Sequence, residues 1–291
     1  MYINNANLSK ASKWLYAVVP ILFFGFVWLN YIALQTMDTE AVMAEQIAEM
    51  GELPFLVMNL LPFAVLLGLL LLWVKFVHRQ SLTALTTARP RISWRRFFFA
   101  FFLWGGISTA LIAADYLINP QDYQWDFQLV PFLKLLAIAI VLVPLQTAFE
   151  EYFFRAYLMQ GLALVFKRAW VPLVITSVLF GLMHIANPEV EKLGYGLLIY
   201  YIGTGFFLGI TAIMDDGIEL SLGFHAANNL FTALWVTSTW TVFQTPSVLR
   251  DVSEPTLGWN MFLPLLVCFP LLLWIYAKKY KWKDWRVRLV G

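Results

Sequence analysis

The 291-residue sequence is poor in charged residues, in cysteine and in histidine. Charged residues make up 13% of it and hydrophobic residues 60%, whereas soluble proteins usually carry about 25% charged residues. Such an apolar excess does not fit into one soluble core, so we expect much of it to face lipid. The single cysteine, Cys268, excludes an internal disulfide and a metal site built from several cysteines.

Long apolar stretches fill most of the sequence. A membrane-spanning helix needs about 20 apolar residues, and a backbone exposed to lipid must satisfy its own hydrogen bonds, as a helix does. We therefore predict an all-α fold, a polytopic membrane helical bundle with about eight transmembrane helices. The eight stretches cover approximately residues 14–35, 55–77, 97–118, 129–150, 170–187, 195–214, 220–240 and 259–277, and the fourth continues into a short helix over about 151–166.

Basic residues mark one side of this predicted bundle. With eight spans, seventeen of the twenty Lys and Arg residues fall on the side that holds both termini, and the exceptions are Lys134, Lys192 and Arg250. Because basic loops stay in the cytoplasm, we expect a multi-pass protein of the cell membrane, or of the endoplasmic reticulum membrane in a eukaryote, with both termini cytoplasmic.

We expect one integral membrane domain with three segments. Residues 1–128 would supply the first three helices and a basic cytoplasmic loop, and residues 241–291 the last helix and a basic tail. The middle segment, 129–240, holds three polar motifs within apolar stretches, so we expect it to be the catalytic core.

Two adjacent carboxylates form the first motif, where the fourth stretch ends. Glu151 and Arg155 are four residues apart, so they share a helix face and can pair. Glu150 is rotated by about 100° from Glu151 and can face another partner. Pro144 cannot donate a backbone hydrogen bond and should kink the span. A structural ion pair at the membrane boundary is the alternative explanation.

The other two motifs carry histidines. His184 stands among apolar residues late in the fifth stretch, where a structural histidine is the usual alternative. His225 and Asn229 are four residues apart in the seventh stretch and face the same way. Bonding between helices is the alternative role for this second pair.

Together the three motifs contain the groups that peptide hydrolysis requires. A carboxylate and an imidazole can activate water, and an imidazole N–H and an amide N–H can stabilise an oxyanion. The set contains no serine or cysteine paired with a base. Because each ionisable group within a span costs about 2.5–3.5 kcal/mol, the motifs indicate one water-accessible cavity.

The motifs resemble those of a known family. Glu-Glu-x-x-x-Arg at 150–155, Phe-x-x-x-His at 180–184 and His-x-x-x-Asn at 225–229 occur in the order found in the CPBP family. This is the CAAX protease and bacteriocin-processing group of intramembrane proteases, related to the prenyl-protein endopeptidase Rce1. The resemblance covers approximately residues 140–235.

The resemblance implies a role for each motif residue. Glu150 would be the catalytic carboxylate, and His184 would be its partner in activating water. His225 and Asn229 would stabilise the oxyanion. The supporting residues would be Glu151 and Arg155.

Metal dependence stays open at this point, because family members are described both as metalloproteases and as glutamate peptidases. Glu150, His184 and His225 are candidate ligands, since two His and one Glu form a known catalytic zinc set. However, the sequence has no His-Glu-x-x-His motif, and Asn229 suits an oxyanion better than a metal. We favour a metal-free mechanism, with zinc as the one candidate cofactor.

We therefore predict an intramembrane endopeptidase that cuts near the cytoplasmic face with water activated by Glu and His. Expected partners are membrane lipid and a peptide or membrane-protein substrate, such as a prenylated or bacteriocin-like peptide, and not nucleic acid. The alternatives are a non-catalytic scaffold or immunity protein of the same fold and a proton-relaying transporter. Transporters often contain repeated halves with broken helices, and the sequence shows none. It indicates neither the oligomeric state nor the substrate.

Overall fold

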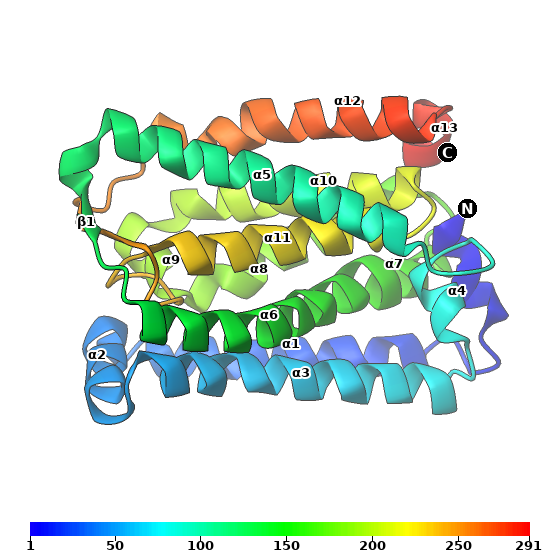
Figure 1. Cartoon of the computed structure of the whole chain (residues 1–291). Coiled ribbons are helices and arrows are strands. Elements are labelled where there is room, and N and C mark those ends of the chain that lie inside the picture. Colours follow the sequence, from blue (N-terminus) through cyan, green and yellow to red (C-terminus); the bar gives the residue numbers. More distant parts are fainter.

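The computed structural model describes the backbone of residues 1–291 and every side chain except those of 259–260. The chain forms a bundle of long helices with a small sheet at one end, and both termini lie at the other end (Figure 1). Among the described residues, five helical segments are long and apolar enough to cross a membrane. They are α1 (Leu15–Leu34), α3 (Glu52–Phe76), α5 (Trp94–Ile118), Leu129–Ala163, which begins with α6 (Leu129–Glu151), and Tyr195–Met214, which contains α10 (Leu198–Met214).

Three shorter helices complete the predicted set: α8 (Trp170–Met183), α11 (Glu219–Trp235) and α12 (Phe269–Tyr280). Each of the eight predicted stretches thus contains a helix, and the all-α membrane bundle is confirmed. The number of spans stays a prediction, because these three helices are shorter than a full crossing.

The short elements connect the long helices, extend them or lie near the chain termini. They are the 3₁₀ helices Tyr2–Leu8, Pro120–Asp122, His184–Ala186, Tyr195–Leu197 and Trp259–Phe262, the π-helices Tyr152–Leu158 and Pro264–Cys268, and the α-helices α2 (Thr39–Met50), α4 (Leu82–Thr86), α7 (Met159–Ala163), α9 (Pro188–Leu193) and α13 (Trp285–Val290).

The seventh predicted stretch is longer than the helix that it contains. α11 ends at Trp235, and the chain becomes extended in β2 (Val236–Thr237). The β-branched side chains at 236 and 237 favour this change. β2 pairs in parallel with β3 (Leu249–Asp251), and β1 (Tyr123–Trp125) pairs with the other edge of β3 in antiparallel fashion. This sheet ties the loops after α5 and α11 together at the end opposite the termini (Figure 1).

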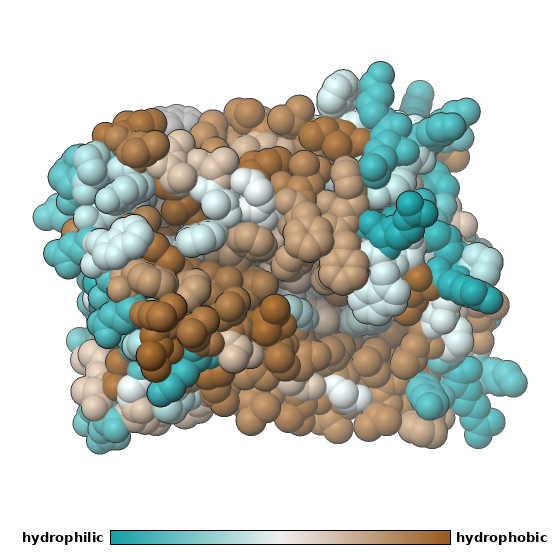
Figure 2. Space-filling view, viewed as in Figure 1, coloured by the Kyte–Doolittle hydropathy of each residue, from teal (hydrophilic) through white to brown (hydrophobic). Residues whose placement is uncertain are grey.

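The surface matches a membrane protein. Hydrophobic residues cover the middle of the bundle, and hydrophilic residues gather at its two ends (Figure 2). Many large apolar side chains are exposed on this middle band, as with Phe26, Trp28 and Ile140. In water such exposure would be costly, whereas in lipid it is neutral.

Small residues set the distance between α8 and α10. A Cβ atom at Gly205 would lie 2.7 Å from the backbone oxygen of Ser177, which is too close for any other residue. At Gly209 it would lie 2.6 Å from the side chain of Leu173. The Gly205–Gly209 spacing therefore does permit close helix approach, as the sequence predicted.

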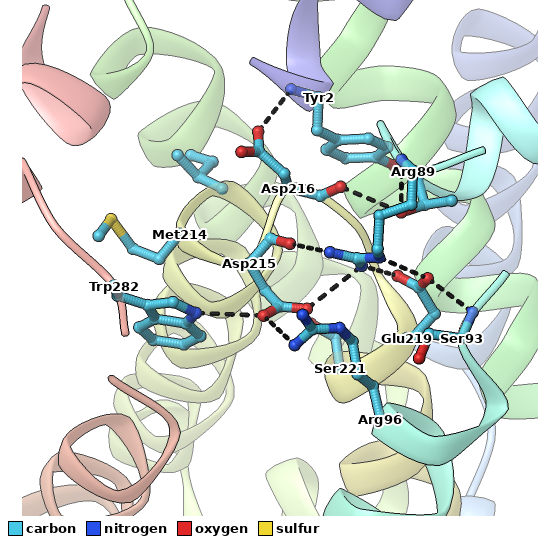
Figure 3. A network of polar contacts seen from close by, with 12 residues as sticks. Tyr2, Arg89, Ser93, Arg96, Met214, Asp215, Asp216, Glu219, Ser221 and Trp282 are labelled. Carbon is cyan, nitrogen blue, oxygen red and sulfur yellow. Dashed lines mark hydrogen bonds and ion pairs between the residues drawn. The ribbon is translucent and has the colours of Figure 1, made fainter. Parts of the chain in front are cut away.

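A charged network holds the end of the bundle that carries the termini (Figure 3). Arg89 contacts Asp215 at 3.3 Å and Glu219 at 2.5 Å, and Arg96 contacts Asp215 at 3.0 Å. The network also includes contacts of Asp216 with the backbone nitrogen of Tyr2 and the guanidinium of Arg288. It fixes the start of α11, because Glu219 lies in the first turn of that helix.

Candidate active site

The two carboxylates of the first motif lie inside the bundle. α6 passes through Pro144 without interruption and continues as the π-helix Tyr152–Leu158 and then as α7. Glu150 and Glu151 are 3% and 0% exposed. The helix continues to Ala163, and it includes most of the short helix predicted for residues 151–166. A π-helical turn next to buried charges is typical of functional sites.

Arg155 and Glu151 form the predicted ion pair. Arg155 Nη1 lies 3.0 Å from Glu151 Oε1, and both side chains are fully buried. The guanidinium also lies 4.0 Å from the ring centre of Phe180 and donates to the backbone oxygen of Gly205 at 3.4 Å. Arg155 thus balances the charge of Glu151 and leaves Glu150 to other partners.

His225 lies between the two carboxylates. Its Nδ1 atom donates to Glu151 Oε1 at 2.9 Å, and its Nε2 atom lies 3.7 Å from Glu150 Oε2. The ring is therefore oriented by Glu151, with Nε2 facing Glu150. This arrangement requires α11 to pack directly against α6, as it does.

A chain of side-chain amides reaches Glu150 from the other direction. Gln146 Nε2 donates to Glu150 Oε1, and Asn229 Nδ2 donates to Gln146 Oε1 at 3.1 Å. Asn228 Nδ2 donates to Asn229 Oδ1 at 3.1 Å, and Trp104 Nε1 donates to Asn228 Oδ1 at 3.0 Å. Asn229 is thus joined to Glu150 through Gln146, a residue that the sequence analysis did not select.

His184 is held by the preceding helix and by stacking on the ring of Tyr201. Its Nδ1 atom donates to the backbone oxygen of Phe180 at 2.8 Å, so in the neutral ring Nε2 is the acceptor. The ring stacks on Tyr201 with centroids 4.1 Å apart and an interplanar angle of 11°. His184 thus has a fixed orientation, although the described contacts do not join it to Glu150.

One cavity of about 770 Å³ is lined by all four predicted catalytic residues, Glu150, His184, His225 and Asn229. Glu151 and Arg155 do not line it, in keeping with a supporting position behind His225. The cavity also reaches residues 236–238, 240–243 and Asp251, which lie at the sheet end of the bundle. It therefore extends away from the end that carries the termini (Figure 1).

Two comparisons relate the chain to known proteins. A family model described as "Type II CAAX prenyl endopeptidase Rce1-like" matches residues 131–231. The "Uncharacterized protein YyaK" of Bacillus subtilis (strain 168) is 34% identical over 215 residues, which cover 72% of each chain. The chain belongs to the Rce1-like family. No solved structure matches it.

Membership of the Rce1-like family implies a peptidase and supports intramembrane endopeptidase activity at the level of the family. The matched residues 131–231 include every predicted site residue, from Glu150 to Asn229. They exclude α1, α3, α5 and α12, so the family-specific part is the central segment of the bundle.

The zinc set considered from the sequence does not assemble in this Rce1-like chain. Among the side chains that the structure describes, no group of three or more His, Cys, Asp or Glu residues is arranged to hold a metal ion. His184 and His225 both line the cavity, but only His225 contacts Glu150. We therefore derive no catalytic step through a metal.

Gln146 is the site residue that sequence reasoning missed. It lies four residues before Glu150, on the same face of α6, and it is buried. A buried amide within an apolar span is a costly group that needs a partner. The four-residue spacing between Gln146 and Glu150 could have identified Gln146 from the sequence, because its hydrogen-bond partner is Glu150, one helical turn later.

Proposed function

We propose that this chain is an intramembrane endopeptidase in which Glu150 activates water as a general base. The observation that carries the proposal is the environment of Glu150 Oε2. The Glu150 side chain lines the cavity. Its Oε2 atom is buried, has no hydrogen-bond partner among the described residues and lies 3.7 Å from His225 Nε2. A carboxylate held with one free oxygen in a cavity can accept a proton from water.

In the proposed reaction, the water oxygen attacks the carbonyl carbon of the scissile peptide bond and Glu150 takes up the proton. His184, which lines the same cavity, assists as a second acceptor, because its Nε2 atom is an acceptor in the neutral ring. The C–N bond then breaks, and the proton held by Glu150 passes to the leaving amine. Amine and carboxylic acid products account for every atom of peptide and water.

His225 and Asn229 are the proposed oxyanion donors. Glu151 accepts from His225 Nδ1, which leaves Nε2 to face Glu150 and the cavity and to donate when it carries a proton. Asn229 Nδ2 has two hydrogens, and Gln146 accepts one of them. The second remains to stabilise negative charge on the carbonyl oxygen. Each such donor is typically worth about 10²–10³ in rate.

We further propose that both termini are cytoplasmic and that the cut lies within the membrane. The distribution of basic residues supports the orientation. Glu150 is buried inside the bundle and the cavity extends away from the termini, which supports a cut within the membrane. A cut near the cytoplasmic face, as predicted from the sequence, is the alternative. Reporter fusions at Gly291 and near Glu45 should report opposite sides of the membrane, and fusions on one side would contradict this orientation.

The proposed reaction is metal-free, and a peptide-cleavage assay tests it. Purified protein in neutral detergent would be incubated with quenched fluorescent peptides that contain an apolar segment, with and without a strong chelator. The expected result is cleavage that the chelator does not change and that the Glu150→Gln variant lacks. Loss of cleavage with the chelator, restored by added zinc, would overturn the metal-free mechanism. Absence of cleavage in a folded wild-type protein would favour a non-catalytic scaffold.

A further inference from the structure

Basic side chains gather where α5 begins and α12 ends, at the end of the bundle that carries the termini (Figure 1). Arg95 lies in the first turn of α5, and Lys278 and Lys279 lie in the last turn of α12. All three side chains are exposed. Among the side chains that the structure describes, none of the three forms an ion pair, so their charge is available to a ligand.

Contacts between α5 and α12 fix the position of these basic residues. Lys279 Nζ lies 4.1 Å from the ring centre of Phe99, and the Arg96 guanidinium lies 4.0 Å from the ring centre of Tyr280. The rings of Phe99 and Tyr280 also pack together, with centroids 6.0 Å apart. Arg95 precedes Phe99 by four residues and shares its face of α5. Arg95 and Lys279 are therefore both next to Phe99, within reach of one ligand.

Nearby carboxylates do not neutralise this basic surface. The carboxylates of the charged network drawn in Figure 3 are already paired with Arg89, Arg96 and Arg288. Residues 278–291 contain six basic residues and a single acidic one, Asp284. A surface with one sign of charge attracts ligands of the other sign, so the ligand that fits here is an anion.

An exposed apolar surface continues from the basic residues toward the middle of the bundle. Phe98 and Phe102 follow Arg95 by three and seven residues on the same face of α5, and Phe102 is 65% exposed. On α12, Trp274 is 58% exposed, and Lys278 follows it by one helical turn. Each helix thus has a basic residue at its end and apolar side chains below it. A phospholipid carries its headgroup and acyl chains in the same order, whereas a soluble anion would contact the basic residues alone.

The chain after α12 supplies a second apolar surface at the same end. α13 is held to the bundle by Arg288, which donates to the last backbone oxygens of α10 at 3.2 and 2.9 Å. Trp285, Val287 and Val290 remain exposed at an end of the bundle that is otherwise hydrophilic (Figure 2). In water this exposure would be costly. Helices that expose both apolar and basic residues are typical of the headgroup region of a membrane, which indicates that lipid covers this surface.

We propose that the junction of α5 and α12 is a binding site for one anionic phospholipid. The headgroup phosphate lies between Arg95 and Lys279, and the acyl chains follow Phe102 and Trp274 toward the middle of the bundle. A zwitterionic lipid offers the same chains without the net negative charge. The site is separate from the central cavity, because none of these four side chains lines it.

Thermal unfolding of the purified protein in neutral detergent tests the proposal. Phosphatidylglycerol is titrated into the protein, and phosphatidylcholine with the same chains and glycerol 3-phosphate are the comparison ligands. A ligand that binds the folded protein raises its melting temperature. We expect a saturable rise with phosphatidylglycerol that shrinks as salt is added, and little change with the other two. An equal rise with phosphatidylcholine would overturn the need for negative charge, and an equal rise with glycerol 3-phosphate would overturn the lipid in favour of a soluble anion.

A double variant tests the two basic residues. Arg95→Gln with Lys279→Gln should raise the concentration of phosphatidylglycerol that gives half of the effect by about tenfold or more, because each basic residue at an anionic lipid surface strengthens binding. Lys13→Gln with Lys75→Gln is the matched control, since these two residues are also exposed and lie at the same end, beside α1 and in the last turn of α3. Equal weakening in the two double variants would show a general attraction to the basic end and overturn the site.

The apolar part of the site is tested with both basic residues in place. Phe102→Ala removes an exposed side chain that the fold does not bury, so the protein should fold as the wild type does. It should bind phosphatidylglycerol more weakly, because the acyl chains lose an apolar contact. Unchanged binding by Phe102→Ala would overturn the placement of the acyl chains along α5.

Discussion

The molecule contains two clusters of charged side chains, and they differ in how completely their atoms are partnered. The terminal network is the charged network at the end of the bundle that carries the termini (Figure 3). Its Asp215 accepts hydrogen bonds from Arg89, Arg96 and Trp282. Its Glu219 accepts from Arg89 and from the backbone nitrogen of Ser93. All four carboxylate oxygens of Asp215 and Glu219 have a hydrogen-bond partner.

The central cluster is different. Glu150 Oε2, Glu151 Oε2 and Arg155 Nε are buried and have no hydrogen-bond partner among the described residues. Buried polar atoms are almost always partnered in proteins, so several orphans in one place need an explanation. The difference is what the proposed function requires: the terminal network uses its bonding capacity to hold the bundle together, whereas Glu150, the one member of these three that lines the cavity, keeps an oxygen for water or substrate.

The largest expected effect comes from breaking the fully buried pair of the central cluster. Arg155→Gln removes the charge that balances Glu151, and it should lower the free energy of unfolding by about 3–5 kcal/mol. It should also reduce activity, because Glu151 orients His225. Thermal unfolding in detergent checks the first effect. A melting temperature equal to that of the wild type would show that the pair does not stabilise the fold.

The next largest effect is expected for Asn229, and it tells a catalytic role of this amide apart from a role in helix packing. Asn229→Ala should lower kcat by about 10²–10³ with little change in melting temperature, because His225 still supplies one oxyanion donor. The control is Trp235→Phe, which removes a hydrogen bond from the same helix to Thr109 and should lower stability while kcat per folded molecule is kept, since Trp235 does not line the cavity. If both variants lose stability and activity in the same proportion, Asn229 serves only to join helices.

A substitution in the terminal network should lower stability and leave turnover unchanged, the reverse of the result expected for Asn229→Ala. Glu219→Gln keeps the volume of the side chain but removes the charge that faces Arg89, and it should cost about 1–3 kcal/mol of stability. Turnover per folded molecule should be unchanged, since Glu219 does not line the cavity. A selective loss of turnover at normal melting temperature would mean that this network takes part in the reaction.

The smallest effect is a pH dependence at His78, a third buried polar position just beyond the end of α3. Burial lowers the pKa of His78 to about 4, and its ring contacts Tyr157 Oη at 3.0 Å and Ser9 Oγ at 3.2 Å. The unfolded chain, with an ordinary histidine pKa of about 6.5, takes up a proton first as pH falls.

Stability should therefore be fully present above about pH 6.5 and decline toward pH 4. Melting temperatures measured across this window should fall less steeply for His78→Gln than for the wild type. Identical slopes in the two proteins would show that His78 is not the group responsible.

The helices and the local contacts of the site could be predicted from the sequence. Apolar stretches locate the eight helices, and the four-residue spacing of Glu151 and Arg155 is enough to predict their pair, because both properties depend on neighbours in the chain. The spacing of Gln146 and Glu150 carried the same kind of information. The end of α11 at Trp235 was not predicted, since residues 236–237 are apolar enough to continue a span but pair with β3 instead.

The tertiary arrangement of the site could not be derived from spacing. Whether His184 or His225 lies next to Glu150 depends on how α8 and α11 pack against α6, and nothing in either histidine motif decides it. The direction of the cavity likewise depends on where the loop after α11 lies, since residues of that loop line the cavity. Both features arise from contacts between residues far apart in the chain.

The central claim is that Glu150 is the catalytic carboxylate, and turnover per folded molecule in two matched variants tests it most directly. Glu150→Gln and Glu219→Gln each replace a buried carboxylate by an amide of the same size. Glu150→Gln should lose about 10²–10⁴ in turnover and keep its melting temperature, while Glu219→Gln should keep its turnover and melt at a lower temperature. Wild-type turnover in folded Glu150→Gln would contradict the assignment of this carboxylate.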